Sequence, residues 1–119
     1  MTTFGRNMKL TVARAHQERL HATLTDGLGA RSVCPEPDFT VYTLADDFNV
    51  GVYVVDDHEA LGEEDQVKAP WLELLVDDLD AARGRLEGLG VAVVPYPRDP
   101  EHRYYRLPGG PVFRLASPS

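Results

Sequence analysis

The fold is decided by residues 71–94, which read WLELLVDDLDAARGRLEGLGVAVV. The first six residues alternate like a strand and place Leu72, Leu74 and Val76 on one face. Asp77 or Asp78 can then cap a helix, because a carboxylate accepts from its free N–H groups. Apolar residues at helical spacing follow until glycine allows the helix to end, and residues 91–94 form another strand. This stretch predicts the order β-α-β.

The same order occurs earlier in the chain. Residues 8–12 read as a strand, and residues 15–26 read as a helix with Leu20, Leu24 and Leu28 on one stripe. Each half then continues with three strands, predicted at residues 30–34, 39–44 and 50–55 and at residues 91–94, 104–107 and 112–115. The sequence therefore predicts an α+β fold with two βαβββ modules in one domain, residues 1–119. The modules are residues 8–56 and 71–116, joined by an acidic connector, residues 57–70. Such paired modules leave a cleft between them, and clefts are where small molecules bind.

The composition indicates an ordinary globular protein. Of 119 residues, 43% are apolar and 26% are charged. The net charge of −7 argues against binding to nucleic acid phosphates. Most of this negative charge lies in residues 56–70, which contain six acidic side chains and one cation, Lys68. We favour a solvated connector, and the alternative is an acidic surface that attracts a cationic ligand or partner.

Single residue types set further expectations. One cysteine, Cys34, excludes an internal disulfide, and we expect it to be a small packing residue. His16 and His21 fall on the polar side of the first helix and are expected to be solvated. No apolar run reaches membrane-spanning length, and residues 1–7 lack the apolar core of a signal peptide. We expect a cytoplasmic protein without nucleic-acid or membrane partners.

Several motifs make the chain resemble the vicinal oxygen chelate superfamily. Those motifs are residues 76–82, Leu86, Leu89-Gly90, residues 105–110 and 113–115, with a more divergent copy at residues 28–30, 38–44 and 51–53. This superfamily contains glyoxalase I, the bleomycin-resistance proteins and the extradiol dioxygenases. The resemblance spans residues 8–116 and implies paired βαβββ modules that form a curved mixed sheet around a cleft, often in a homodimer. It leaves function open, because this fold supports several chemistries.

The resemblance also implies where a divalent metal would be held. Its ligands would be His, Glu or Gln at the start of the first strand and in the last strand of each module. The matching positions here are Asn7, Met8, Lys9, Gly51, Val52, Tyr53, Trp71 and Arg114. None is a usual metal ligand, and Arg114 would place positive charge where the cation should lie. We therefore expect no metal and no other cofactor.

The remaining candidates describe a ligand-binding surface. Trp71, Tyr53 and Tyr104 can form an aromatic wall, and Glu73, Arg106 and Arg114 can act as charged anchors. Glu73 is expected to pair with Arg114 or Lys9. The alternative is that these side chains fill the core or a dimer interface. The acidic net charge suits a cationic ligand and the arginines suit an anionic one, so the charge of the ligand stays open.

Three functions are compatible with these features. The first is a metal-free small-molecule binding protein, similar to the bleomycin-resistance branch and homodimeric. The second is a metal-dependent lyase, isomerase or dioxygenase, which requires that His or Glu side chains converge after all. The third is a protein-interaction or regulatory module that uses the cleft or the connector.

Overall fold

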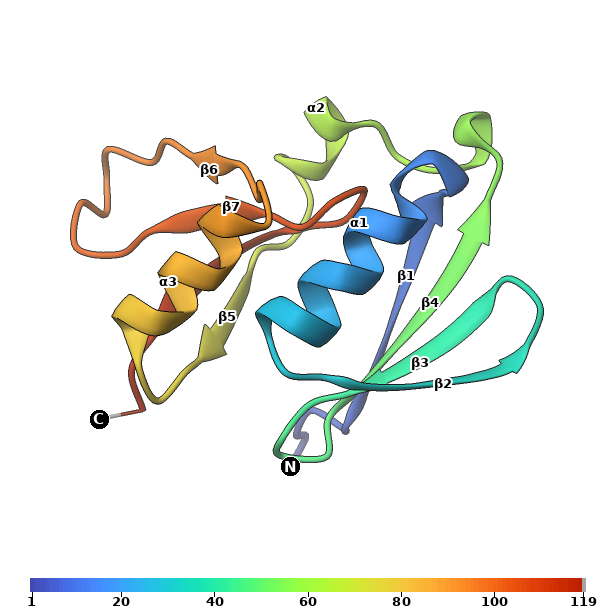
Figure 1. Cartoon of the computed structure of the whole chain (residues 1–119), viewed down its shortest axis with the longest axis horizontal. Helices are drawn as coiled ribbons and strands as arrows, with labels where there is room; N and C mark the ends of the chain where they lie inside the picture. The colour runs from blue at the N-terminus through green and yellow to red at the C-terminus, as the bar shows by residue number, and fades with distance from the viewer. Residues whose placement is uncertain (119) are drawn as a thin grey trace.

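Two four-stranded sheets, one in each half of the chain, form the frame of the molecule (Figure 1). The computed structural model describes residues 1–118. Sheet A has the order β1-β4-β3-β2 and contains β1 (Asn7–Ala13), β2 (Arg31–Glu36), β3 (Phe39–Thr43) and β4 (Asn49–Val55). Sheet B has the order β5-β8-β7-β6 and contains β5 (Leu72–Leu75), β6 (Val93–Val94), β7 (Tyr104–Arg106) and β8 (Val112–Ala116). In each sheet the first strand pairs with the last in parallel, and the other pairs are antiparallel. The predicted pair of βαβββ modules is confirmed.

The helix of the first module runs through three conformations. It begins as a 3-10 turn, η1 (Arg14–His16), continues as α1 (Gln17–Ala22) and ends as a π-helical turn, η2 (Thr23–Gly27). The hydroxyls of Thr23 and Thr25 donate to backbone oxygens four residues earlier, at 2.7 and 2.8 Å. Such bonds compete with the regular helix, which accounts for the widened last turn in the predicted helix.

The helix of the second module, α3 (Leu79–Gly88), begins as the sequence predicts. The Asp78 carboxylate accepts a hydrogen bond from the Ala81 N–H at 3.0 Å, which satisfies one free donor of the first turn. A strand was expected over residues 91–94, but only Val93 and Val94 pair. Val91 instead donates its N–H to the Leu86 oxygen and closes the end of the helix.

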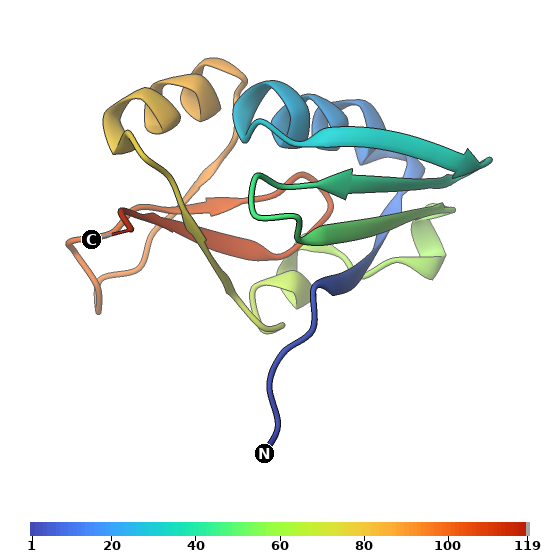
Figure 2. The same cartoon turned by 90° about the horizontal axis from the view of Figure 1, so that it is seen from below.

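One apolar core joins the two modules. Leu20 and Leu24 from the first module lie in the same buried cluster as Leu86, Tyr105 and Phe113 from the second. Both helices lie on the same side of the two sheets (Figure 2), so the helical sides of the modules share this core. We call the opposite side of each sheet its outer face. Side chains on the outer faces do not take part in this core and can interact with one another or with a ligand.

Three local predictions are wrong. The strand predicted over residues 30–34 extends to Glu36. The register shifts between Val33 and Glu36, so Pro35, which has no N–H, does not have to pair in the sheet. Cys34 lies in this irregular segment and is exposed, so it does not pack in the core. His16 is half-buried against Gly109 and so is not simply solvated, whereas His21 is exposed as expected and its Nδ1 lies 2.9 Å from the Tyr42 hydroxyl.

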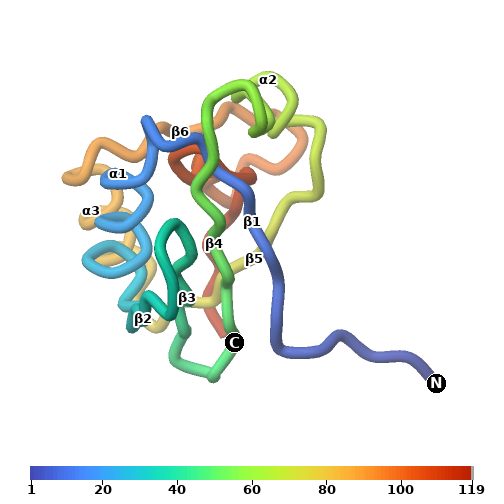
Figure 3. The backbone as a smooth tube through the Cα atoms, turned by 90° about the vertical axis from the view of Figure 1, so that its right-hand side faces the viewer, coloured from blue at the N-terminus to red at the C-terminus, as the bar shows by residue number. Residues whose placement is uncertain are grey.

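The connector carries two short helical turns, η3 (Asp57–Glu59) and α2 (Glu63–Gln66). Its acidic side chains are exposed, whereas Gln66 is buried and donates to the Gly109 oxygen at 3.4 Å. The first residues of the chain extend away from the body (Figure 3), and Phe4 among them is fully exposed. Across residues 1–118, no helix has the length and apolar content needed to cross a membrane.

Candidate functional site

An ionic network occupies the outer face of sheet B. Arg114 and Glu73 are register partners on β8 and β5, and the Arg114 Nε donates to the Glu73 carboxylate at 2.8 Å. Arg114 Nη1 donates to Asp99 at 2.9 Å, and the Tyr104 hydroxyl donates to the same Asp99 oxygen at 2.6 Å. His102 Nδ1 lies 2.9 Å from that oxygen. The expected pairing of Glu73 with Arg114 is confirmed.

This network shifts the titration of its members. The Tyr104 hydroxyl, followed by His102 and Arg114, lowers the pKa of Asp99 to about 2. The bond to Asp99 raises the pKa of Tyr104, and the bonds to Tyr104 and Glu73 raise the pKa of Arg114. Asp99 is therefore an ionised acceptor at neutral pH that fixes residues 95–103 to the sheet.

We expect Asp99→Asn to weaken the fold at neutral pH and to have little effect in strong acid. The folded-state pKa of Asp99 lies below its ordinary value of 3.8. Its contribution is therefore complete above that value and is lost as pH falls through about 2. Urea titrations of both proteins between pH 6 and pH 2 should give stabilities that differ at pH 6 and converge toward pH 2. A constant difference down to pH 2 would contradict this assignment.

Three aromatic rings pack together beside the network. Trp71 lies 5.3 Å from Tyr104 and 5.0 Å from Tyr96, and Tyr96 lies 5.0 Å from Tyr104, all between ring centroids. The Trp71 indole also donates to the Val67 oxygen at 2.8 Å. Edge and tilted contacts of this kind stabilise a cluster. The rings contact one another and the connector, and Tyr104 is buried.

The predicted ligand-binding residues therefore fall in three places. Trp71, Glu73, Tyr104 and Arg114 come together on sheet B, where their polar atoms bond within the chain. Arg106 lies at the edge of this group, where its guanidinium donates to the Glu63 oxygen at 3.1 Å. Tyr53 lies on the outer face of sheet A, in the other module.

A separate hollow of about 370 Å³ lies on the outer face of sheet A. Phe39 and Tyr53 are register partners on β3 and β4, and their rings stack with centroids 4.3 Å apart. Gly51 leaves room for this stack, because a Cβ there would lie 3.1 Å from Cε1 of Phe39. The hollow is lined by Asn7, Met8, Lys9, Phe39, Val41, Asn49, Gly51 and Tyr53.

Lys9 gives this hollow a positive charge. Its Nζ lies 5.5 Å from the centroid of the Tyr53 ring, at cation–π distance. None of the residues lining the hollow is acidic. Within residues 1–118, no carboxylate lies at ion-pair distance from Lys9. Other cations of the described residues, such as Arg19 and Lys68, also lack an ionic partner, but Lys9 alone of these lines a hollow beside two stacked rings.

The side chains of the outer faces do not fit a divalent metal. At the positions implied by the resemblance, Lys9 and Arg114 supply positive charge. Glu73, a carboxylate outside those positions, is already paired with Arg114. In the part of the chain that the structure describes, no three His, Cys, Asp or Glu side chains gather in a way that could hold a metal. A metal centre needs about three such donors and an open position.

Sequence reasoning missed Phe39, Tyr96 and Asp99. Phe39 had a readable signal, because a hairpin of two predicted strands sets it opposite Tyr53. Tyr96 and Asp99 lie between strands, in a segment with three prolines and no periodic pattern. Only the folded structure shows where their side chains lie.

Known structures share this architecture. No protein-family model matches the sequence, and no curated protein matches it significantly. The fosfomycin resistance protein FosX from Mesorhizobium loti is similar over 100% of this chain and 94% of its own, with a TM-score of 0.72 and 20% identity. A possible glyoxalase from Bacillus cereus is similar over 96% of this chain and 98% of its own, with a TM-score of 0.69 and 16% identity.

A third similar structure carries ligands. It is a variant of FosX from Listeria monocytogenes in complex with Mn(II) and 1S,2S-dihydroxypropylphosphonic acid. It covers 100% of this chain and 95% of its own, with a TM-score of 0.75 and 16% identity. These neighbours are members of the vicinal oxygen chelate superfamily. At these identities they establish architecture, and this chain therefore has the vicinal oxygen chelate fold.

Proposed function

We propose that this protein binds a small planar anion on the outer face of sheet A, without a catalytic metal. The observation that carries the proposal is Lys9, a cation that has no carboxylate partner in residues 1–118 and lies beside the stacked rings of Phe39 and Tyr53. A ring of the ligand would pack on this stack, and its carboxylate would pair with the Lys9 ammonium. An aromatic carboxylate has both features.

Two further observations support an anionic ligand. The amide of Asn49 lies in the same hollow, where its Nδ2 donates to the Asn7 oxygen at 3.1 Å and places polar groups at the rim. The Listeria monocytogenes neighbour holds a phosphonic acid, which is also an anion, although together with Mn(II). Arg114, the other predicted anchor, is engaged by Glu73 and Asp99, so it is less available to a ligand than Lys9.

Lys9→Met is expected to weaken binding of 1-naphthoate at least about tenfold, since a hydrogen bond to a charged group is worth about 1.5–3 kcal/mol and each 1.4 kcal/mol is tenfold. Isothermal titration calorimetry measures the affinity, and 1-naphthalenemethanol provides the same ring without charge. Lys9→Arg should restore much of the binding. Lys68→Met, the change of the one other lysine, is the matched control and should bind like the wild type.

Two outcomes would overturn the proposal. One is that folded Lys9→Met binds 1-naphthoate as tightly as the wild type does. The other is that the wild type binds the uncharged alcohol as tightly as the carboxylate. Circular dichroism shows whether each variant is folded.

The second candidate is a metal-dependent enzyme, which the Mn(II) complex of the Listeria monocytogenes neighbour favours. In this chain it would need donors that the described residues do not bring together. A homodimer and a cytoplasmic location also stay predictions. Light scattering on a sizing column would measure the oligomeric state.

A further inference from the structure

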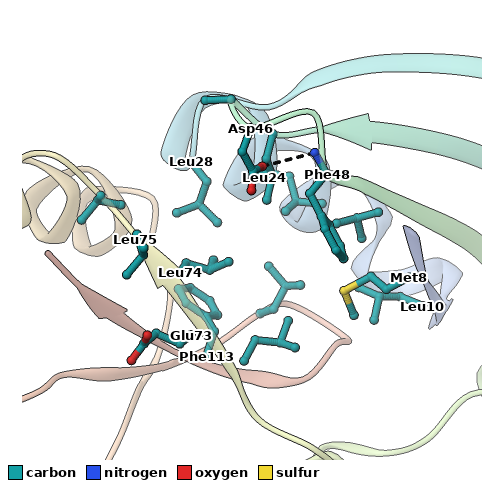
Figure 4. A pocket seen from close by; sticks show the side chains of 16 residues that line it. Met8, Leu10, Leu24, Leu28, Asp46, Phe48, Glu73, Leu74, Leu75 and Phe113 are labelled. Atoms are coloured by element: carbon teal, nitrogen blue, oxygen red, sulfur yellow. Dashed lines mark hydrogen bonds between the residues drawn. The ribbon is translucent and has the colours of Figure 1, made fainter. Parts of the chain in front are cut away.

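A second hollow lies between the two modules, on the helical side of the sheets. Its volume is about 480 Å³, which is within the range of small-molecule sites. Met8, Phe48 and Leu28 border it from the first module, and Leu74 and Phe113 border it from the second (Figure 4). It shares Met8 with the proposed anion site on the outer face of sheet A, and its other lining residues are different.

The chemistry of the lining favours an apolar occupant. Thirteen of the sixteen lining residues carry large apolar side chains, and Ala45 is also apolar. Ordered water needs two to four polar partners, which such a wall does not supply. An apolar molecule would instead cover hydrocarbon that is left facing the solvent.

Asp46 is exposed at the edge of this hollow, and it is the one charged lining residue without an ion pair in residues 1–118. One of its carboxylate oxygens, Oδ1, accepts from the Phe48 N–H at 3.2 Å, and within residues 1–118 Oδ2 has no hydrogen-bond partner. Arg6 donates to the backbone oxygen of Asp46 and does not line the hollow. The other acidic residue of the lining, Glu73, is paired with Arg114, and its carboxylate points away from the apolar side chains around the hollow in Figure 4.

We propose that the hollow between the modules binds an apolar small molecule whose head group donates a hydrogen bond to Asp46. An aliphatic amine or alcohol has this form. An aliphatic carboxylate does not, because its charge would face the Asp46 carboxylate. The two sites thus select opposite head groups, an acid on the outer face of sheet A and a donor here.

Methyl NMR of protein labelled with 13C-methyl methionine tests this site directly. The chain has two methionines, Met1 and Met8, and the side chain of Met8 borders the hollow (Figure 4). Met8 also lines the hollow on the outer face of sheet A, so a Met8 shift is assigned to the hollow between the modules only if it is removed by Leu74→Phe, a change at a residue that lines this hollow alone. The probes are octylamine, 1-octanol and octanoate. Octylamine and 1-octanol should shift the Met8 methyl signal in a saturable way and leave Met1 unchanged, and octanoate should bind at least about tenfold more weakly than octylamine.

Two variants separate the parts of the proposal. Asp46→Asn should remove most of the preference for octylamine over octanoate, while Asp57→Asn, the same change on an exposed connector acid, should not. Leu74→Phe should fill the hollow and weaken all three probes. The proposal fails if the folded wild type shows no saturable Met8 shift with octylamine. It also fails if octanoate binds as tightly as octylamine, or if Asp46→Asn leaves the preference unchanged.

Discussion

Gly109→Ala is expected to lower the free energy of unfolding by about 2–5 kcal/mol, because two costs combine at this position. Gly109 has a φ of +71°, in the left-handed region that costs a residue with a side chain about 1–2 kcal/mol. A Cβ there would also lie 2.8 Å from the Cβ of His16, which is close to the backbone and cannot swing away. The turn that contains Gly109, in the second module, thus packs closely against His16 of the first module.

Two other glycines separate these costs. Gly90 has a φ of +78° with nothing within 4 Å of an added Cβ, so Gly90→Ala should cost about 1–2 kcal/mol. Gly84 lies within α3 with open space around it, and Gly84→Ala should stabilise the protein by about 0.5–1 kcal/mol. Urea unfolding of the three variants should rank them in this order. Equal losses for Gly109→Ala and Gly90→Ala would contradict the contact with His16.

Leu86→Ala is expected to cost about 2–5 kcal/mol, as large-to-small changes in a packed core do. Leu86 is fully buried, and its Cδ2 would lie 3.0 Å from a Cβ built on Gly27, at the end of the first-module helix. The variant should lower the stability of the whole chain, since the core is shared. Trp71 fluorescence and far-ultraviolet circular dichroism should then report one transition.

Leu61→Ala is the matched control, because Leu61 is 55% exposed in the connector. It should change stability by no more than about 0.5 kcal/mol. Two separate transitions in Leu86→Ala, one for each probe, would show that the modules unfold independently. The shared core would then not hold the two hollows in place.

The fold could be predicted because its signals are local. The stripe of Leu20 and Leu24, the cap at Asp78 and the alternating residues of β5 each depend on neighbours a few positions away. Repetition of these signals predicted the paired modules. The Glu73–Arg114 pair was also within reach, because one buried or half-buried charge requires another.

The sites could be predicted only in part, because they depend on how distant segments meet. Tyr53 was assigned to one aromatic wall with Trp71, yet it stacks on Phe39 in the other module. Trp71 packs against Tyr96. The position of Tyr96 depends on the hydrogen bonds of Asp99 in the same loop, and no periodic pattern in the sequence indicates it. Leu74 was placed on one face of its strand with Leu72 and Val76, and it packs against the core cluster, but packing between the modules leaves a hollow beside it.

The most direct test of metal-free anion binding is one calorimetric titration of 1-naphthoate into the wild-type protein, carried out first in EDTA and then with Mn(II) in excess. We expect binding in EDTA, with one site per chain and an affinity that Mn(II) does not change. Binding that appears only when Mn(II) is present would contradict metal-free binding. That result would point instead to a metal-dependent site built from donors in another arrangement.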